Sequence, residues 1–182
     1  MRRGEVLGLR WADLDLDGSR VSVNQAIISV AYCLKVSDVK TGTGRRTINL
    51  DARTVGVLQA WRKAVLAERL LLGPAFVDND LVFAQPDGIP IHPQAFSQAF
   101  DRAVARLGLP VITLHDFRHT HASLLLRSGV PVKVVSERLG HANPAFTLTV
   151  YQHVIPGMQE EAASLFSELI FGVDEPAVTP AP

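Results

Sequence analysis

The sequence predicts an α+β protein that is mainly α-helical, with a small three-stranded antiparallel sheet packed against the helices. Stretches rich in β-branched residues are confined to the first 50 residues, where turn-forming segments separate them. Beyond that point, apolar residues recur mostly at the three- and four-residue spacing of amphipathic helices. The chain has 182 residues, of which 47% are hydrophobic, and neither a repeat nor a linker divides it. We therefore expect one sizeable core.

The predicted strands lie in the first part of the chain. Residues 1–11 have a loosely helical apolar spacing, and the turn-rich sequence ADLDLDGS follows them. Strands are expected at 20–30, 32–40 and 45–50. The segment TGTG (41–44) is expected to form a flexible hairpin turn between the second and third strands. The sheet then has a basic tip, which consists of Lys40, Arg45 and Arg46.

Two amphipathic helices are expected in the middle of the chain. Asp51 is a candidate N-cap for a helix that extends to about Leu71. After the short apolar run LVFA and the turn PDG, His92 and Pro93 begin a helix that Gly108 ends. The residues expected on the two buried faces are Val55, Leu58, Trp61, Val65 and Leu66 in the first helix, and Phe96, Phe100, Val104 and Leu107 in the second.

Four further helices follow. Thr113, with Asp116 three residues later, has the pattern of a capping box, and that helix stops at Gly129. Pro131 begins another helix, which Gly140 closes. Asn143-Pro144 then caps a short helix that carries Tyr151, residues 158–171 form a last amphipathic helix, and residues 173–182 form a disordered tail.

The charges are unevenly distributed, although the net charge is zero. Residues 1–138 contain all 18 Lys and Arg against 13 acidic residues, a net charge of +5, and the other five acids lie beyond them. This distribution fits either a nucleic-acid partner or ordinary solvated charge. Cys33 is the single cysteine, so no internal disulfide can form. Without an apolar segment of ~20 residues or a signal peptide, we expect a cytoplasmic protein with no membrane contact.

One helix begins with residues suited to binding an anion. His115 and Arg118 are three residues apart in its first turn, so they share a face, and the free N–H groups there also favour an anion. The pattern indicates a phosphate site or, alternatively, an ordinary polar helix start. His119 and His121 raise the possibility of a metal, but the Glu of the zinc motif is missing and no carboxylate cluster is evident. We therefore expect neither a metal nor another cofactor.

Four segments together resemble a known family. HDFRHTHAS (115–123) and LGHANPAFTLTVYQHV (139–154) resemble the C-terminal half of the catalytic domain of tyrosine recombinases, or phage integrases. MRRGEVLGLRWADLDLD (1–17) resembles the first arginine box of that family, and VKTGTGRRTINL (39–50) resembles its lysine-bearing hairpin. The four segments occur in the family's order and span the chain.

The resemblance implies a set of site residues. It makes Tyr151 the nucleophile, Glu5 a supporting acid, and Arg45 and Arg46 contacts to DNA. The implied catalytic residues are Arg2, Lys40, His115, Arg118, His141 and Tyr151. Other interpretations remain open for three of them: Tyr151 as a core aromatic, Lys40 as a solvated charge with Lys35 or an arginine in its place, and His141 as a packing residue.

The residue types suit the implied chemistry. A phosphodiester attacked by a phenol develops negative charge, which two arginines can bind with fixed donors. A nearby histidine can accept the phenolic proton, and a lysine can protonate the departing 5′ oxygen. The implied product is a 3′-phosphotyrosine link to double-stranded DNA, formed without ATP or metal. Helix 158–171 either packs on its own domain or docks onto a neighbouring subunit.

The resemblance also implies the domain organisation. Residues 1–172 correspond to a tyrosine recombinase catalytic domain that lacks its first helices and the N-terminal DNA-binding domain. Two functions are therefore expected: a site-specific recombinase or integrase, or a catalytically incompetent integrase fragment that folds and at most binds DNA or a full-length partner.

Overall fold

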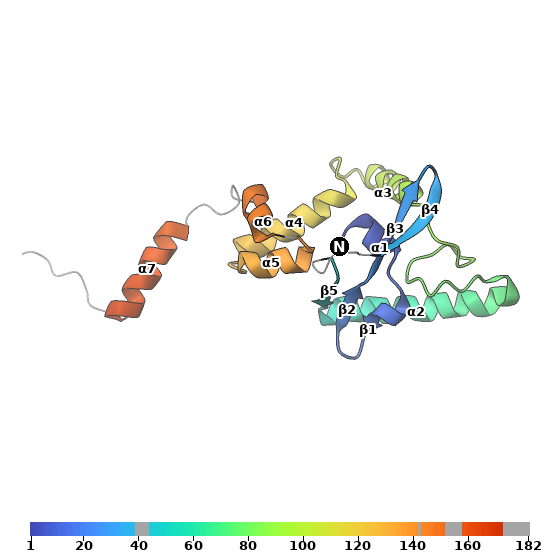
Figure 1. The fold of residues 1–182 in the computed structure, drawn as a ribbon, viewed down its shortest axis with the longest axis horizontal. Coiled ribbons are helices and arrows are strands. Elements are labelled where there is room, and N and C mark those ends of the chain that lie inside the picture. The colour runs from blue at the N-terminus through green and yellow to red at the C-terminus, as the bar shows by residue number, and fades with distance from the viewer. Residues whose placement is uncertain (39–43, 142, 152–157, 173–182) are drawn as a thin grey trace, which may run out of the picture.

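The computed structural model describes residues 1–38, 44–141, 143–151 and 158–172. Figure 1 shows helices α1, α2 and α3 around the strands, helices α4, α5 and α6 grouped beside them, and α7 set apart from both groups. The mainly α-helical α+β class predicted from the sequence is confirmed.

The strands form two antiparallel units instead of the single predicted sheet. Strands β1 (Leu14–Asp15), β2 (Arg20–Val23) and β5 (Arg46–Asn49) form a three-stranded sheet in the order β1-β2-β5. Strands β3 (Gln25–Val30) and β4 (Cys33–Asp38) form a separate hairpin.

The difference has two local causes. Asn24 divides the first predicted strand, because its side chain donates to Asp13 Oδ1 at 2.7 Å. The tight turn of the hairpin lies at Ala31 and Tyr32, whose φ angles of 49° and 63° suit the primed turns of two-residue hairpins. The predicted pairing of the second and third strands is therefore wrong among the described residues, where β5 pairs with β2; residues 41–43 lie outside them.

A short N-terminal helix packs closely on the hairpin. Helix α1 (Arg3–Leu7) ends at Gly8, where an added Cβ would lie 2.9 Å from the Ala26 Cα. Only glycine permits this approach of two backbones. Leu7 is completely buried against Ile27 and Leu81. The contact positions the chain around Arg2 against the strands.

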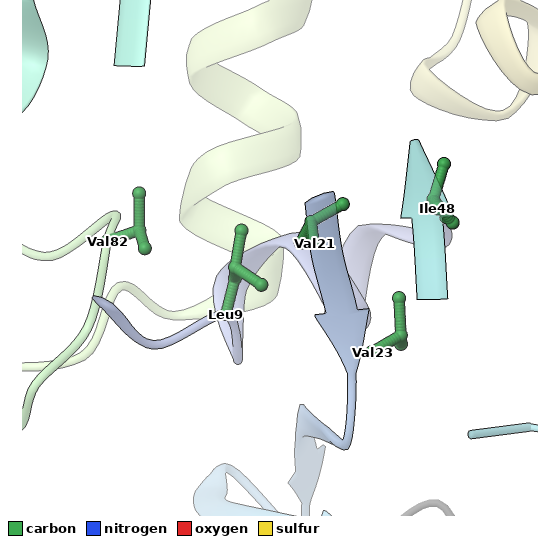
Figure 2. Close-up of a cluster of buried hydrophobic side chains, with 5 residues drawn as sticks. All are labelled: Leu9, Val21, Val23, Ile48 and Val82. Carbon is green, nitrogen blue, oxygen red and sulfur yellow. The ribbon is translucent and has the colours of Figure 1, made fainter. Parts of the chain in front are cut away.

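The first core cluster lies between the sheet and the loops beside it. Leu9, Val21, Val23, Ile48 and Val82 form it, and they come from four separate segments (Figure 2). The short 3-10 helix η1 (Trp11–Asp13) follows Leu9, and an isolated bridge joins Arg10 to Leu81.

Helix α2 (Ala52–Leu72) begins as predicted and buries less than predicted. The Asp51 side chain accepts a hydrogen bond from the Thr54 N–H at 3.0 Å, which confirms the cap. Of the five residues expected on its buried face, only Val55 is buried. Trp61 is half-exposed and donates from its indole to the Val82 carbonyl. The 3-10 helix η2 (Gly73–Ala75) follows α2.

Helix α3 (Pro93–Arg106) connects the strand region to the helical group. The predicted helix start is confirmed, and the His92 ring caps it by accepting a hydrogen bond from the Gln94 N–H. Val104 is buried on the expected face. Leu107 is 69% exposed, and its predicted burial is wrong because the helix has ended before it.

Helices α4 (Leu114–Arg127), α5 (Val132–Leu139) and α6 (Pro144–Tyr151) enclose the second core cluster. The predicted capping box of Thr113 and Asp116 is present at the start of α4. The buried members of the cluster are Ala122, Leu126, Val135, Leu139 and Tyr151. Helix α5 packs against both α4 and α6, so the cluster fixes the position of α6 relative to α4.

Helix α7 (Met158–Phe171) lies apart from the other described helices (Figure 1). Its apolar side chains Leu165, Phe166, Leu169 and Ile170 are all exposed. Of the two roles expected for this helix, packing on its own domain is therefore not observed. None of the helices in the described parts is long and apolar enough to cross a membrane.

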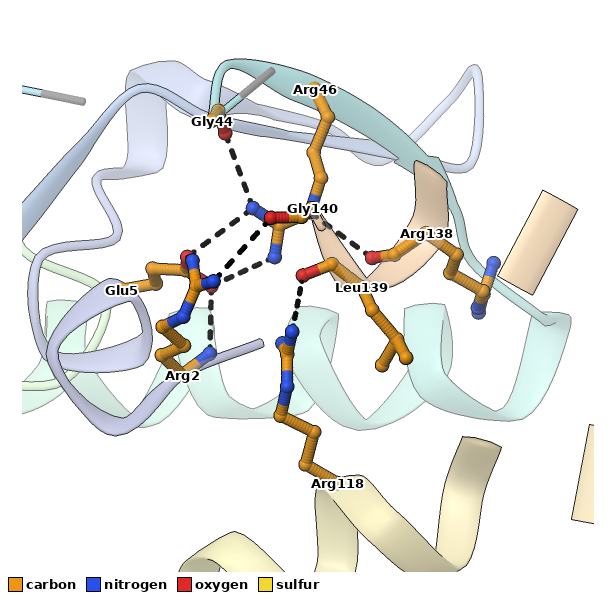
Figure 3. A network of polar contacts seen from close by, with 8 residues as sticks. All are labelled: Arg2, Glu5, Gly44, Arg46, Arg118, Arg138, Leu139 and Gly140. Atoms are coloured by element: carbon orange, nitrogen blue, oxygen red, sulfur yellow. Dashed lines mark hydrogen bonds and ion pairs between the residues drawn. The ribbon is translucent and has the colours of Figure 1, made fainter. Parts of the chain in front are cut away.

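A buried ion pair joins α1, β5 and α5. The Glu5 carboxylate contacts Arg46 Nη2 at 2.8 Å and Arg2 Nη1 at 3.0 Å, and the Arg46 side chain is only 7% exposed (Figure 3). Arg46 Nε also donates to the carbonyl of Arg138 at 3.0 Å. At the end of α5, Gly140 has a φ of 70°, and a Cβ there would lie 2.6 Å from Arg46 Nη1.

The ion pair makes stability depend on pH. Burial alone would raise the pKa of Glu5, but the hydrogen bonds and charges of Arg46 and Arg2 outweigh it and hold that pKa below its ordinary value of 4.5. A carboxylate with a depressed folded-state pKa stabilises the fold above its unfolded pKa. This contribution is lost as the pH falls through the folded value.

We expect Glu5→Gln to lower the free energy of unfolding by about 3–5 kcal/mol at pH 7, because it leaves buried Arg46 without its counter-charge. Urea unfolding at pH 7 and at steps below pH 4.5 measures both effects, and the variant should lose part of the acid dependence. Glu137→Gln is the control: its pair with Lys133 is exposed, so it should cost at most about 1 kcal/mol. Equal losses in the two variants would contradict the prediction.

Candidate functional site

Two arginines from distant parts of the chain meet at the C-terminal turn of α5. Arg2 Nη2 donates to the Gly140 carbonyl at 3.4 Å, and Arg118 Nη2 donates to the Leu139 carbonyl at 2.6 Å (Figure 3). Carbonyls at a helix C-terminus lack helical partners and carry partial negative charge. They hold both guanidinium groups in fixed positions.

Arg118 has a donor that no described residue satisfies. Its side chain is buried, with the residue 6% exposed, and Nη1 has no hydrogen-bond partner among the described residues. Burial, and then the positive charge of Arg2, lowers the pKa of Arg118 to about 10, so it stays charged at neutral pH. A buried donor without a partner is costly, and an anion would satisfy it.

Tyr151 ends α6 with its hydroxyl directed at α4. The residue is 3% exposed, its ring belongs to the second core cluster, and its hydroxyl lies 2.8 Å from His119 Nδ1. Burial raises the pKa of Tyr151, and the charge of Arg118 acts in the opposite direction. Tyr151 is therefore a core aromatic as well as a phenol with a fixed hydroxyl.

Two further histidines lie near this pair. His115 is exposed in the first turn of α4, with its ring edge-on to His119 at a centroid distance of 4.6 Å. Burial, and then the charges of His119 and Arg118, lowers its pKa. His141 Nδ1 lies 2.8 Å from Thr147 Oγ1 on α6. Burial, and then Arg118, lowers the pKa of His141 to about 4, so it is neutral at pH 7.

The structure thus gathers most of the residues expected in the site. His115 and Arg118 come from α4, and Tyr151 ends α6. Arg2 precedes α1, and His141 follows α5. Glu5 lies beneath Arg2 as the acid between two arginines. Lys40 lies outside the described residues.

The basic tip differs from the expectation. Arg45 is exposed, as a contact to DNA requires, but Arg46 is directed inward to Glu5. An exposed position for Arg46 was expected because sequence spacing does not show which of two adjacent arginines has a buried partner.

Sequence reasoning considered His119 only as a metal ligand and did not connect it with Tyr151. Its position directly after Arg118 and four residues after His115 was the available signal. Within the described residues, no group of three or more His, Cys, Asp or Glu side chains is placed to hold a metal ion.

Comparison with known proteins identifies curated relatives. The chain is 30% identical over 181 residues to a tyrosine recombinase XerC-like protein of Caldanaerobacter subterraneus subsp. tengcongensis, covering 93% of this chain and 46% of that one. It is 30% identical over 172 residues to the ICEBs1 integrase of Bacillus subtilis, again covering 93% and 46%. The chain spans about half the length of these relatives.

Solved structures show the same fold. One is the Tn1549 transposon integrase in complex with transposon right end DNA, with a TM-score of 0.75, 20% identity, and coverage of 94% of this chain and 55% of that chain. Another is the XerH site-specific recombinase bound to palindromic difH substrate in a post-cleavage complex, with a TM-score of 0.62, 28% identity, and coverage of 92% and 42%. The model of the phage integrase family matches residues 1–157. The chain belongs to the phage integrase family.

Proposed function

We propose that the chain is the catalytic part of a site-specific DNA recombinase or integrase. It cleaves and rejoins DNA strands through a 3′-phosphotyrosine intermediate, with Tyr151 as the nucleophile. The observation that carries the proposal is the buried Nη1 of Arg118, which has no hydrogen-bond partner in the described part of the chain. The charge of Arg118 interacts with that of Arg2 and lowers the pKa of Tyr151 against the effect of burial.

A phosphodiester fits this arrangement. Its non-bridging oxygens gain negative charge as a phenol attacks phosphorus, and Arg2 and Arg118 offer donors that keep their charge. His115, exposed beside them, adds a third donor for the same oxygens. His141 lies in the turn between α5 and α6. Its hydrogen bond to Thr147 connects this turn, whose carbonyls bind the two arginines, to α6, which carries Tyr151.

Cleavage leaves a free 5′ hydroxyl, and Lys40 protonates the departing 5′ oxygen. Rejoining is the reverse reaction, in which a 5′ hydroxyl attacks the phosphotyrosine link. The energy of the phosphodiester bond is retained in that link, so this scheme uses neither ATP nor a metal.

Double-stranded DNA is the proposed partner. XerH was solved bound to its difH substrate and the Tn1549 integrase with transposon DNA, and we extend this kind of partner to the present chain. Arg45 is exposed beside the site, as a phosphate contact requires. Action on DNA also fits a cytoplasmic location.

Self-association on DNA forms part of the proposal. The exposed apolar side chains of α7 have no covering element in the described parts, and a second copy bound to adjacent DNA can bury them. Helix 158–171 then docks onto a neighbouring subunit.

We expect wild-type protein to form a covalent adduct with DNA that survives denaturing gels. Nicked duplexes that tile the DNA flanking its own gene are the substrates, because a nick lets the cleaved strand diffuse away. Tyr151→Phe should abolish the adduct, whereas Tyr32→Phe should retain it, since Tyr32 is an exposed residue of the hairpin turn. If neither the wild type nor Tyr151→Phe forms an adduct, the chain is a non-catalytic integrase fragment.

Arg118→Lys tests the phosphate site. The substitution retains the charge and removes the forked donors, so adduct formation should slow by about 10²–10³-fold, as expected on loss of a donor to the transition state. Single-turnover rates on the same nicked duplex measure this. Arg127→Lys, on the same helix and exposed, should change the rate less than twofold; equal effects of the two substitutions would argue against the assignment.

Replacing Phe166 and Leu169 together by Asp should weaken DNA-dependent self-association by at least about tenfold. Each side chain contributes about 1.5–3 kcal/mol when buried, and 1.4 kcal/mol corresponds to tenfold. Sedimentation velocity on a duplex with two sites measures the assembly. Ser164→Asp adds an acid at an exposed polar position of α7 and should leave it unchanged.

A further inference from the structure

We infer that His119 is the proton acceptor for Tyr151: its Nδ1 takes the phenolic proton as the Tyr151 oxygen attacks the scissile phosphate. The inference rests on the proposed function, and it gives a catalytic role to a residue that the sequence connected only with metal binding. Of the three histidines around the site, it selects one and excludes the other two from this step.

The geometry fits direct proton transfer. The Tyr151 hydroxyl and His119 Nδ1 are 2.8 Å apart, within the range needed for a general base. The tyrosine ring is held in the second core cluster, so its hydroxyl has a fixed direction. His119 lies one residue after Arg118, so the proton acceptor and the phosphate-binding arginine come from the same turn of α4.

The direction of this hydrogen bond follows from the environment of the phenol. Burial raises the pKa of Tyr151, so the phenol keeps its proton at neutral pH. That buried O–H requires an acceptor, and His119 Nδ1 supplies one with its lone pair. His119 is then the tautomer that carries its proton on Nε2.

The other two histidines are less suited to accepting this proton. His141 directs Nδ1 to Thr147, and its pKa of about 4 makes it a weak acceptor at neutral pH. His115 lies on the exposed side of His119, edge-on to its ring. The His119 ring contacts both His115 and Tyr151, and among the described residues the phenol forms its hydrogen bond with His119 and not with His115.

The charges around His119 come from both helices that pack there. On α4, the Asp116 carboxylate interacts with His119 and attracts an imidazolium, while His115 and the adjacent Arg118 oppose it. His141, at the turn before α6, interacts with it as well and is neutral at pH 7. A bound phosphate adds negative charge near His119 and favours proton transfer when substrate is present.

The proposed step is balanced. A bond forms between the Tyr151 oxygen and phosphorus, and the bond from phosphorus to the 5′ oxygen breaks. The phenolic proton moves to His119 Nδ1, and the 5′ oxygen takes a separate proton from the ammonium proposed at Lys40. On rejoining, a 5′ hydroxyl attacks phosphorus and the His119 imidazolium returns its proton to the departing Tyr151 oxygen.

The kinetic test uses His119→Asn, whose amide oxygen can accept the hydrogen bond but cannot take the proton. On the nicked duplex that supports adduct formation, the wild-type rate should rise with pH through an imidazole titration. His119→Asn should lose this inflection and react about 10²-fold more slowly at pH 7, a general-base effect. Burial raises the pKa of Tyr151 from its ordinary value of 10.0, so the gap should narrow only at a pH above that value, where phenolate forms without a base. His121→Asn, which alters a histidine bonded to Arg138 on the same helix, should keep the inflection.

A second test needs no DNA, because the chain has only two tyrosines. In a Tyr32→Phe background, the ¹³Cζ signal of tyrosine reports on Tyr151 alone. The nitrogen shifts of His119 should show a bare Nδ1 and a protonated Nε2 above the imidazole titration. The Tyr151 signal should change when the His119 ring gains a proton, and this change should be absent in His119→Asn.

The outcomes separate the two claims. Adduct formation by wild type, with an unchanged rate and pH profile in His119→Asn, would overturn the role of His119 and leave Tyr151 as the nucleophile. A protonated Nδ1 on His119 would overturn it as well. If wild type forms no adduct on any duplex, the proposed function fails and the catalytic role of His119 fails with it, whatever the nuclear magnetic resonance spectra show.

Discussion

The buried contact between Glu5 and Arg46 is the interaction on which the rest of the site depends. One carboxylate binds two arginines, and Arg46 also reaches the carbonyl of Arg138 at the end of α5. The strand sheet, the N-terminal helix and the second core cluster therefore meet at a single ion pair (Figure 3). Its removal would leave a buried charge without a partner and free the end of α5, which holds Arg2 and Arg118.

The same pair explains why the site attracts an anion. Glu5 pairs directly with Arg2 and Arg46, and it reaches Arg118 only through the longer-range effect of its charge. Arg118 donates one hydrogen bond, to the carbonyl of Leu139, and its Nη1 has no partner among the described residues. A phosphate bound as proposed would supply an acceptor for that donor. Stability at Glu5 and the proposed phosphate binding at Arg118 would then be two consequences of one charge arrangement.

Local features of the fold could be predicted from the sequence, and long-range ones could not. The caps at Asp51, His92 and Thr113 are correct because each involves a hydrogen bond within three residues. The predicted strand pairing is wrong because Asn24, whose side chain binds Asp13 eleven residues away, divides the first predicted strand. The Arg46 side chain points inward because it binds Glu5, which lies 41 residues earlier in the chain. The spacing of apolar residues in the sequence does not predict such a contact. In the site, the family resemblance supplied Arg2, Arg118, His141 and Tyr151, whereas their mutual placement required the structure.

The assignment of His119 shows the same limit within one helix. Spacing does not distinguish His115 from His119, because the two lie four residues apart on one face of α4 and both are close to Arg118 in the sequence. They differ in their contact with α6: the Tyr151 hydroxyl lies within hydrogen-bond distance of His119, whereas His115 remains exposed. In the proposed reaction, His115 binds phosphate oxygens while His119 receives a proton. A third histidine, His141, stays neutral and joins the turn after α5 to α6. Packing of the tyrosine ring, more than the identity of the histidines, determines which of them performs each task.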